Sequence, residues 1–327
     1  MHNRSEIDQL VTVFGGSGFV GRHVVRALVK RGYRVRVAVR RPDLALHLQP
    51  LGRVGQIHAV GANLRHRGSV EAAARDADVV INLVGILYET GPQRFDAVHA
   101  LGAERVALAA AAIGARLIHV SALGADLNSA AHYARSKAMG ENLTLAALPS
   151  ATILRPSVIF GPEDDFFNKF ASLARIAPAL PLIGGGATRF QPVFAGDVAS
   201  AVVAAIDRPE ACGVTYELGG LEVVSFRELM QFVLATIERR RLLLPIPYGL
   251  ARFMASFLAL SRILGMKPML TPDQVDLLRS DNVVSDEALH AGRTLAGLGV
   301  EPVPMRTVVP SYLWRFRKTG QFKAGMA

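Results

Sequence analysis

The first half of the chain alternates short runs of apolar, often β-branched residues with longer stretches whose apolar residues recur at helical spacing. The short runs lack the polar alternation of a strand with one solvated face, and such runs are typical of a parallel sheet covered on both sides. We predict six strands, at residues 10–14, 33–39, 56–60, 78–85, 115–122 and 151–161. Strands that alternate with helices in this way predict an α/β protein with a doubly wound parallel sheet.

Helices are expected between these strands, and the most regular is an alanine-rich stretch at about 94–113. Beyond about residue 160 the pattern loosens into loops and shorter elements. Ser225 followed by Glu228 has the spacing of a capping box and predicts the start of a helix. We predict a sheet domain at residues 8–160, onto which a segment around 188–206 packs back, and a smaller, interleaved C-terminal lobe at 161–327.

The composition is ordinary for a soluble α/β protein, since half of the 327 residues are hydrophobic and 20% are charged. No run of 18 or more uncharged apolar residues occurs, so we expect no transmembrane helix, and the polar first ten residues predict no signal peptide. The single cysteine, Cys212, excludes an intramolecular disulfide. With nine dispersed histidines it offers no zinc-type spacing, and we predict no metal site.

The net charge of +10 favours a partner of opposite sign, such as a phosphate-bearing cofactor, anionic lipid, an acidic protein surface or nucleic acid. The basic residues are mostly arginines scattered along the chain. A solvated surface would explain most of these arginines equally well. No basic block with interleaved aromatic residues of the RNA-binding type is present, so we expect no nucleic-acid partner.

Three glycines at three-residue spacing follow the first predicted strand, in the segment VTVFGGSGFVGRHVV. Gly15, Gly18 and Gly21 permit a tight turn and let main-chain N–H groups and a helix N-terminus approach a pyrophosphate. The pattern alone is weak, but its place on the first strand-to-helix turn of an alternating chain predicts a dinucleotide site.

The end of the second predicted strand selects the form of the dinucleotide. NAD-binding sites usually carry Asp or Glu there, whereas this strand ends in Arg40 and Arg41, with Asp43 after a proline. A guanidinium can bind a 2′-phosphate that a carboxylate would repel, and Arg22 can add a second positive charge. We therefore favour NADP(H) over NAD(H), although exposed charges at a strand end would give the same sequence.

Tyr133 and Lys137, in HYARSKAMGE, stand four apart in a predicted helix and so share one face. A lysine ammonium close to a phenol favours the phenolate, which permits proton transfer near neutral pH. Ser121, at the end of the fifth predicted strand, can orient a carbonyl oxygen. The same residues would suit a protein that only binds its cofactor, with Lys137 on the ribose and Tyr133 covering the nicotinamide.

These segments resemble the extended and atypical short-chain dehydrogenase/reductase superfamily over about residues 10–205. FGGSGFVG matches the glycine loop of the superfamily, NLVG its segment after the fourth strand, HVSALG its serine, YARSK its Tyr-x-x-x-Lys motif and RPSVIFGP its Arg-Pro segment near the nicotinamide. Asn63 stands where the superfamily usually has Asp. The resemblance implies a Rossmann-type fold. It implies cofactor contacts from Gly15, Gly18, Phe19, Val20, Gly21, Arg22, Arg40, Asn63, Leu64, Leu83, Gly85, Ser121, Tyr133, Lys137, Pro156 and Ser157, of which Ser121, Tyr133 and Lys137 would be catalytic in an active enzyme.

A narrower resemblance extends over nearly the whole chain, to the NAD(P)H-binding accessory subunits of respiratory complex I and their bacterial relatives. It rests on HVSALGAD, YARSKAMGE, RPSVIFGPEDDFFNKFA and TPDQVDLLRSDNVVS. It implies a tightly held NADPH without established turnover, and contact with other complex I subunits near the quinone site. It also implies a cytoplasmic location, peripheral on the cytoplasmic face of the inner membrane.

The segment at 245–268 reads as one apolar helix between proline boundaries. It can fill the interior of the smaller lobe, or it can dock on a hydrophobic partner or on a membrane surface with anionic headgroups. Three functions stay open: the non-catalytic accessory subunit, an active NADP-dependent reductase or nucleotide-sugar epimerase of unknown substrate, and an NADP redox sensor.

Overall fold

The structure, a computed structural model, describes residues 9–259 and 268–320. The chain divides into two compact units whose segments interleave in the sequence. The first unit comprises Met1–Pro156, Ala195–Leu218 and Ser285–Glu301, and the second comprises Ser157–Phe194, Gly219–Val284 and Pro302–Ala327. Residues 188–194 therefore belong to the second unit, while the helix that follows them belongs to the first.

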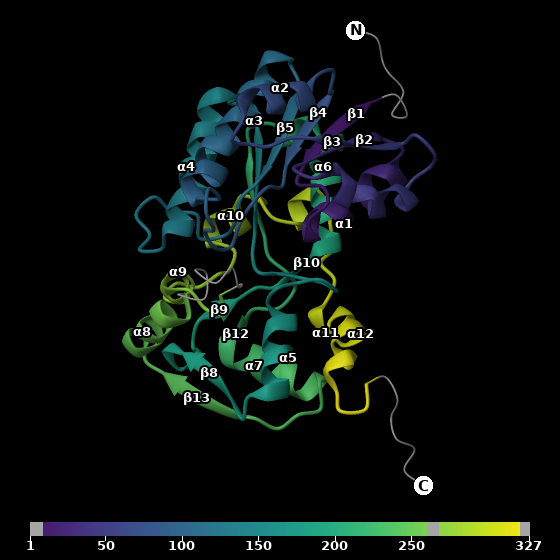
Figure 1. Ribbon diagram of the computed structural model, residues 1–327. Helices are drawn as coiled ribbons and strands as arrows, with labels where there is room; N and C mark the ends of the chain where they lie inside the picture. The colour runs from purple at the N-terminus through teal and green to yellow at the C-terminus, as the bar shows by residue number, and fades with distance from the viewer. Residues whose placement is uncertain (1–8, 260–267, 321–327) are drawn as a thin grey trace. The chain divides into compact units, whose positions relative to one another are not determined.

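The first unit is built on a seven-stranded sheet in the order β11-β6-β5-β4-β1-β2-β3, in which every pair of neighbours is parallel (Figure 1). Its strands are β1 (Leu10–Phe14), β2 (Arg34–Val39), β3 (Ile57–Gly61), β4 (Val79–Asn82), β5 (Arg116–Val120), β6 (Thr152–Pro156) and β11 (Thr215–Leu218). The strand order reverses between β1 and β4, which confirms the doubly wound, Rossmann-type sheet.

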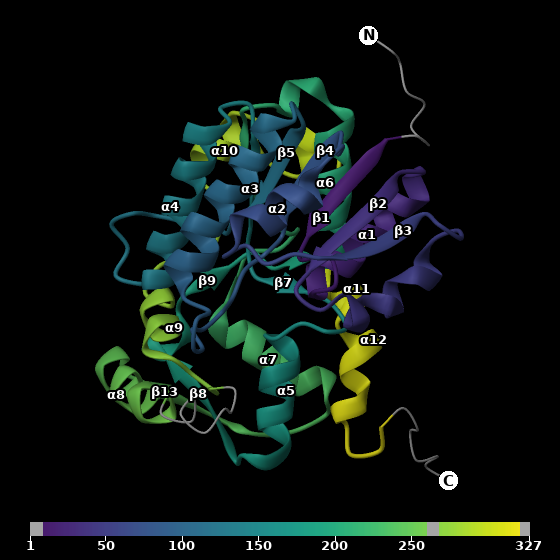
Figure 2. The same cartoon turned by 45° about the horizontal axis from the view of Figure 1, so that its top comes forward.

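Helices cover both faces of this sheet: α1 packs against α6, and α3 packs against α2 and α4 (Figure 2). The helices of the first unit are α1 (Phe19–Arg31), α2 (Arg67–Ala74), α3 (Leu101–Ala112), α4 (His132–Ala147), α6 (Ala195–Asp207) and α10 (Asp286–His290), with 3₁₀ segments at Pro42–Leu51, Pro209–Ala211 and Ala296–Leu298. The single helix predicted at about 94–113 is divided, because Asp96–Ala100 form a π turn before α3 begins.

The second unit has short strands in pairs. They are β7 (Ile159–Phe160) with β10 (Val193–Phe194), β9 (Arg189–Phe190) with β12 (Val224–Ser225), and β8 (Ala179–Ile183) with β13 (Leu242–Ile246). Its helices are α5 (Phe167–Ile176), α7 (Phe226–Thr236), α8 (Tyr248–Ala259), α9 (Pro272–Leu277), α11 (Met305–Val308) and α12 (Pro310–Leu313), followed by a 3₁₀ segment at Trp314–Phe316; Gly184–Gly186 form another. The capping box predicted at Ser225 and Glu228 is confirmed at the start of α7.

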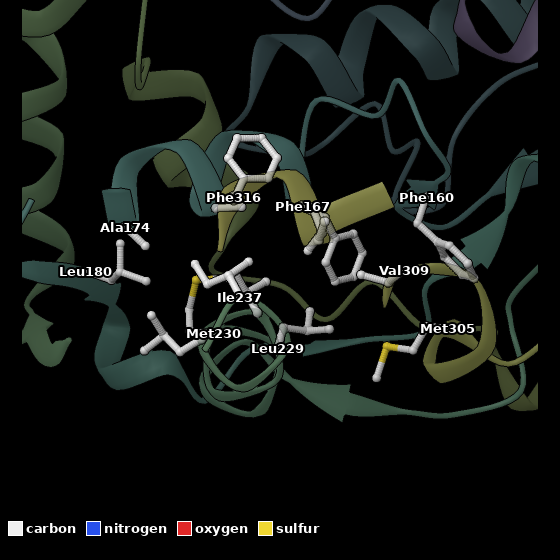
Figure 3. Packing of buried hydrophobic residues seen from close by; sticks show 14 of the residues in the cluster. Phe160, Phe167, Ala174, Leu180, Leu229, Met230, Ile237, Met305, Val309 and Phe316 are labelled. Atoms are coloured by element: carbon white, nitrogen blue, oxygen red, sulfur yellow. The ribbon is translucent and has the colours of Figure 1, made fainter. Parts of the chain in front are cut away.

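The second unit has its own hydrophobic core, built from α5, α7, β8 and the C-terminal helices (Figure 3). Phe160, Phe167 and Phe226 are almost completely buried, and Phe160 and Phe167 meet edge to face with ring centroids 6.1 Å apart. The C-terminal segment is held by Tyr312, whose hydroxyl donates to the buried carboxylate of Asp164. This second core accounts for the independent compactness of the unit.

Two further predicted elements differ from the structure. The strand predicted at 151–161 is divided at Ser157, where β6 ends in the first unit and β7 begins in the second. The prediction of a helix at 245–268 was wrong at its start. Pro245 and Ile246 pair with β8 as part of β13, and α8 begins only at Tyr248. Residues 260–267 of that prediction lie outside the described residues. Within the described ranges, no helix combines the length and hydrophobicity needed to cross a membrane.

Candidate functional site

The glycine turn after β1 forms a cradle that side chains would fill. Gly15 has a φ of 81°, and its N–H donates to the Ala38 carbonyl 3.1 Å away. A Cβ on Gly21 would lie 2.3 Å from the carbonyl oxygen of Gly15, so only glycine fits there. Gly18 caps α1 without a side-chain hydrogen bond, and the first turn contains no acidic residue. The N–H groups of Gly15 and Gly18 donate within the chain, so an anion would be bound by the remaining main-chain N–H groups at the start of α1, as a pyrophosphate site requires.

Phe19 and Val20 open α1 directly after the turn and are half-buried, and Phe19 places its ring edge-on to His23 with centroids 5.9 Å apart. Arg22 follows in the same helical turn and is also half-buried. These residues lie beside the cradle because α1 begins there.

The two arginines at the end of β2 are not equivalent. Arg41 donates to the Asp43 carboxylate 3.0 Å away, and this contact raises the pKa of Arg41 and lowers the pKa of Asp43. Arg40 is exposed, and its side chain makes no hydrogen bond or ion pair with any described residue. Arg40 is therefore the cation available to a ligand at this strand end.

The loop after β3 is shaped by its own side chains. Asn63 Oδ1 accepts the Arg65 N–H at 3.1 Å, and Ser69 Oγ accepts the Asn63 N–H at 3.0 Å. The amide NH₂ of Asn63 is thus the part of its side chain that can donate to a ligand. Leu64 is buried against Gly102 of α3, where a Cβ would lie 3.2 Å from the leucine side chain. Leu64 acts in packing as well as in shaping this loop.

Asn82 organises the end of β4 and fixes the orientation of a buried histidine. Its Oδ1 accepts the Val84 N–H at 3.1 Å, so its NH₂ must be the group that donates to His119 Nδ1, also 3.1 Å away. The N–H of the next residue, Leu83, donates a hydrogen bond to the Phe14 carbonyl. His119 therefore carries its proton on Nε2, which is buried and has no hydrogen-bond partner among the described residues. Burial and the charge of Lys137 lower the pKa of His119 to about 3, so it stays neutral.

Ser121 and Lys137 meet at the end of β5. The Lys137 ammonium donates to the Val120 carbonyl at 3.3 Å, and burial lowers the pKa of Lys137 to about 8, against a smaller opposing effect of Glu141. Ser121 is 4% exposed, and its hydroxyl finds no hydrogen-bond partner within the described part of the chain. A buried hydroxyl without a partner costs free energy, and a bound ligand can remove that cost.

Tyr133 is half-buried, one helical turn before Lys137 on α4. Its ring meets the ring of Phe95 edge-on, with centroids 5.8 Å apart, and that of His99 at 5.3 Å. Gly85 borders the same place, since a Cβ there would lie 3.5 Å from Lys137 Nζ. The structure thus brings Gly85, Tyr133 and Lys137 together.

Sequence reasoning missed His99 and Phe95, which are both buried beside Tyr133. No motif points to them, because the π turn that directs His99 inward is not encoded by a recognisable spacing. Pro156 ends β6, where its carbonyl accepts the Leu123 N–H, but Ser157 belongs to the second unit. There the Ser157 hydroxyl lies 2.7 Å from Asn282 Oδ1 and is already bonded within that unit.

Together, the glycine cradle, the exposed Arg40 and the buried Ser121 hydroxyl fit a dinucleotide laid across the carboxyl ends of the strands. The adenosine half would lie over β2 and β3, and the nicotinamide half over β4 and β5. Among the described residues, no three His, Cys, Asp or Glu side chains gather where they could hold a metal ion.

Comparisons with known proteins agree with this geometry. Residues 11–219 match the NAD dependent epimerase/dehydratase family. The chain is 37% identical to the Arabidopsis thaliana protein NADH dehydrogenase (ubiquinone) 1 alpha subcomplex subunit 9, mitochondrial, over 97% of this chain and 80% of that protein. The Rattus norvegicus protein of the same name is 34% identical over 96% of this chain and 82% of its own length. The ceramide reductase of Caulobacter vibrioides is 37% identical over 60% of each chain.

Solved structures share the fold at low sequence identity. The dTDP-glucose 4,6-dehydratase DesIV from Streptomyces venezuelae, solved with NAD bound, has a TM-score of 0.70 at 18% identity, covering 94% of this chain and 96% of its own. The UDP-glucose 4-epimerase of Thermus thermophilus, in complex with NAD, has a TM-score of 0.58 at 22% identity and covers 83% of this chain and 99% of its own. The chain therefore belongs to the NAD dependent epimerase/dehydratase family and, within it, to the group of the NADH dehydrogenase (ubiquinone) alpha subcomplex subunit 9 proteins.

Proposed function

We propose that this chain is an NADPH-binding, non-catalytic accessory subunit of a bacterial respiratory complex I, peripheral on the cytoplasmic face of the inner membrane. The observation that carries the proposal is the similarity to subunit 9 proteins over almost the whole chain, because it includes the second unit as well as the nucleotide-binding one. An isolated dinucleotide-binding domain would match only the first unit.

NADPH is preferred over NADH because of the charges at the end of β2. Arg40 is exposed and unpaired among the described residues, and no carboxylate stands at the strand end itself. The nearest carboxylate, that of Asp43, forms an ion pair with Arg41. A 2′-phosphate would find a guanidinium that can bind it in bidentate fashion, whereas a ribose hydroxyl would find no acceptor of the usual kind.

The second unit supplies a surface for a partner. Five large apolar side chains of α8 are 40% or more exposed: Leu250, Phe253, Met254, Phe257 and Leu258. The arginines nearby are mostly engaged within the unit, since Arg252 donates to Asp276, Arg239 to the Phe316 carbonyl and Arg241 to the Ala174 carbonyl. We therefore favour an apolar surface of a neighbouring complex I subunit, close to the quinone site, over anionic lipid headgroups as the main contact of α8.

Two measurements test the proposal. Membranes solubilised in mild detergent and separated by size should show the chain migrating with complex I, and migration only as a free protein would contradict it. Cofactor released from the purified chain and identified by mass should be NADP(H). Recovery of NAD(H) would retain the accessory role but overturn the cofactor assignment.

The second candidate is an active NADPH-dependent reductase. The buried Ser121 hydroxyl favours it, since it has no hydrogen-bond partner among the described residues and directly follows Val120, whose carbonyl accepts from Lys137. The similarity to a ceramide reductase over part of the chain favours it as well. Consumption of NADPH that depends on an added carbonyl compound, and that is lost in Tyr133→Phe, would establish this activity in place of a purely structural role.

A further inference from the structure

His99 lies in an unusual piece of main chain. Asp96–Ala100 form a π turn, a rare conformation that occurs frequently at functional sites, and α3 continues directly from it. The histidine side chain is 1% exposed. The wider turn directs His99 into the interior, toward α4 and the loop after β4.

Both ring nitrogens of His99 are used, and they join two different segments. Nε2 accepts the N–H of Ile86, in the loop after β4, at 3.0 Å. Nδ1 lies 2.9 Å from Ser136 Oγ, in α4, and that hydroxyl donates to the Tyr133 carbonyl at 2.8 Å. Because the serine proton is directed to the carbonyl, Nδ1–H must be the donor to Ser136. A single neutral tautomer therefore satisfies every one of these contacts.

The electrostatics keep His99 in that neutral form. Burial lowers its pKa well below the usual value, and the neighbouring charge of Lys137 lowers it further. A proton on Nε2 would face the Ile86 N–H and abolish that bond. The link between the loop and the helix is therefore permanent at physiological pH and does not act as a switch.

The main chain around His99 is closely packed. It therefore cannot shift to replace the hydrogen bonds of the histidine ring if that ring is removed. A Cβ on Gly140 of α4 would lie 2.1 Å from the His99 carbonyl oxygen, and a Cβ on Gly85 would lie 3.7 Å from His99 Nε2. The Phe95 ring stacks on the imidazole with centroids 5.3 Å apart, and the Tyr133 ring meets it edge-on at the same separation. His99 thus contacts the groups that border the nicotinamide half of the proposed site.

We propose that His99 is a positioning residue for the nicotinamide half of the cofactor, because it fixes the loop after β4 against the turn of α4 that carries Tyr133 and Lys137. This inference rests on the proposed dinucleotide binding. The adenosine half lies on the other side of the glycine turn, over β2 and β3, and does not depend on either segment. His99 should therefore matter for the whole dinucleotide and not for its adenosine half.

The test compares two ligands on the full-length chain: NADPH, and adenosine 2′,5′-bisphosphate, which has the adenosine half alone. His99→Leu should weaken NADPH about tenfold, the ratio that about 1.4 kcal/mol gives, and leave adenosine 2′,5′-bisphosphate within about twofold. His99→Gln, whose amide can both accept from Ile86 and donate to Ser136, should restore most of the NADPH affinity. His290→Gln, at an exposed histidine of α10 in the same unit, is the matched control and should leave both affinities unchanged.

Other outcomes overturn the inference. Equal weakening of both ligands in His99→Leu would show a general structural role, and no weakening of NADPH would show no role. If His99→Leu does not fold, Ser136→Ala removes the α4 end of the same link and should show the selective loss at a smaller, about threefold, level. A wild-type chain that binds neither ligand would instead overturn the proposed function.

Discussion

The two units differ in where their energetically unfavourable side chains lie. The first unit buries polar groups at the carboxyl ends of β4 and β5, among them Lys137, His119 and Ser121, and part of their hydrogen-bonding capacity is unused among the described residues. The second unit buries a phenylalanine-rich core and exposes large apolar side chains on α8, such as Phe253 and Phe257. The unfavourable side chains of the first unit are buried polar groups, whereas those of the second unit are apolar side chains exposed at its surface.

The difference indicates two kinds of partner. Buried polar groups without partners cost about 1–3 kcal/mol each, and a small polar ligand that enters the site can remove that cost. Exposed apolar side chains gathered on one helix are instead stabilised by a macromolecular surface. A single chain that has both features is suited to join a bound nucleotide to a larger assembly.

Gly21→Ala should greatly weaken nucleotide binding by the first unit and is expected to have the largest effect. The new Cβ would lie 2.3 Å from the Gly15 carbonyl oxygen, which is main chain and cannot move aside cheaply. We expect NADPH affinity to fall by at least about a hundredfold, or about 3 kcal/mol, in a titration of the purified chain. Gly68→Ala in α2, where a Cβ meets no neighbour, is the control and should bind normally. Normal binding by Gly21→Ala would place the nucleotide elsewhere.

Lys137→Met should reveal the cost of the buried ammonium in the cofactor-free protein. The pKa of Lys137 is about 8 in the folded chain and 10.5 in the unfolded chain. Between these values the unfolded chain keeps a proton that the folded chain has lost, so Lys137 makes the free energy of unfolding rise with pH. The rise should amount to about 3 kcal/mol across that window, and nothing below it.

The free energy of unfolding, measured by urea titration at several pH values, should therefore increase from pH 8 to 10.5 more steeply in the wild type than in Lys137→Met. The same substitution at the exposed Lys30 serves as a control for general alkaline effects. Parallel pH profiles for wild type and Lys137→Met would show that the lysine is solvated.

Arg40→Asp should change the preference between NADPH and NADH while leaving the buried polar groups of the first unit in place. It should weaken NADPH about thirtyfold, about 2 kcal/mol, because a bidentate cation is replaced by a charge that repels the 2′-phosphate. NADH affinity should stay equal or improve. Binding titrations with both cofactors measure the ratio, and Arg53→Asp supplies the same charge change at another exposed position of the unit. An unchanged ratio would remove the basis for preferring NADPH.

Replacing Phe253 and Phe257 together by serine should have the smallest effect on the isolated chain. Their rings contact each other with centroids 5.0 Å apart but are each 63% exposed, so the free energy of unfolding should change by less than about 0.5 kcal/mol. Phe167→Ala, in the core of the same unit, should cost about 3–5 kcal/mol.

The same Phe253 and Phe257 variant should lose migration with complex I in solubilised membranes while it still binds NADPH. Full retention in the complex would show that α8 meets no partner. A large loss of stability would show that α8 is covered by its own chain.

Six of the seven sheet strands and the glycine turn could be predicted because local sequence encodes them, whereas β11 lies beyond the predicted sheet domain. Mostly apolar runs such as 10–14 matched β1 residue for residue, and the glycine spacing placed the turn before α1. Elements whose limits depend on distant pairing could not be read in this way. Pro245 and Ile246 were predicted as the start of an apolar helix, yet they form a strand because β8 lies beside them. The break at Ser157 likewise depends on Asn282, far away in the sequence.

For the candidate site, the sequence determined which chemical groups are present: three glycines at a turn, an arginine in place of an acid at a strand end, and the serine, tyrosine and lysine of β5 and α4. Tertiary structure decided which of them are available. It left Arg40 exposed at the end of β2, buried Lys137 until its pKa fell to about 8, and placed His99 where its ring could join the loop after β4 to α4. The physical reason is that identity and spacing are properties of neighbours along the chain, whereas burial, hydrogen-bond partners and pKa depend on groups that only folding brings together.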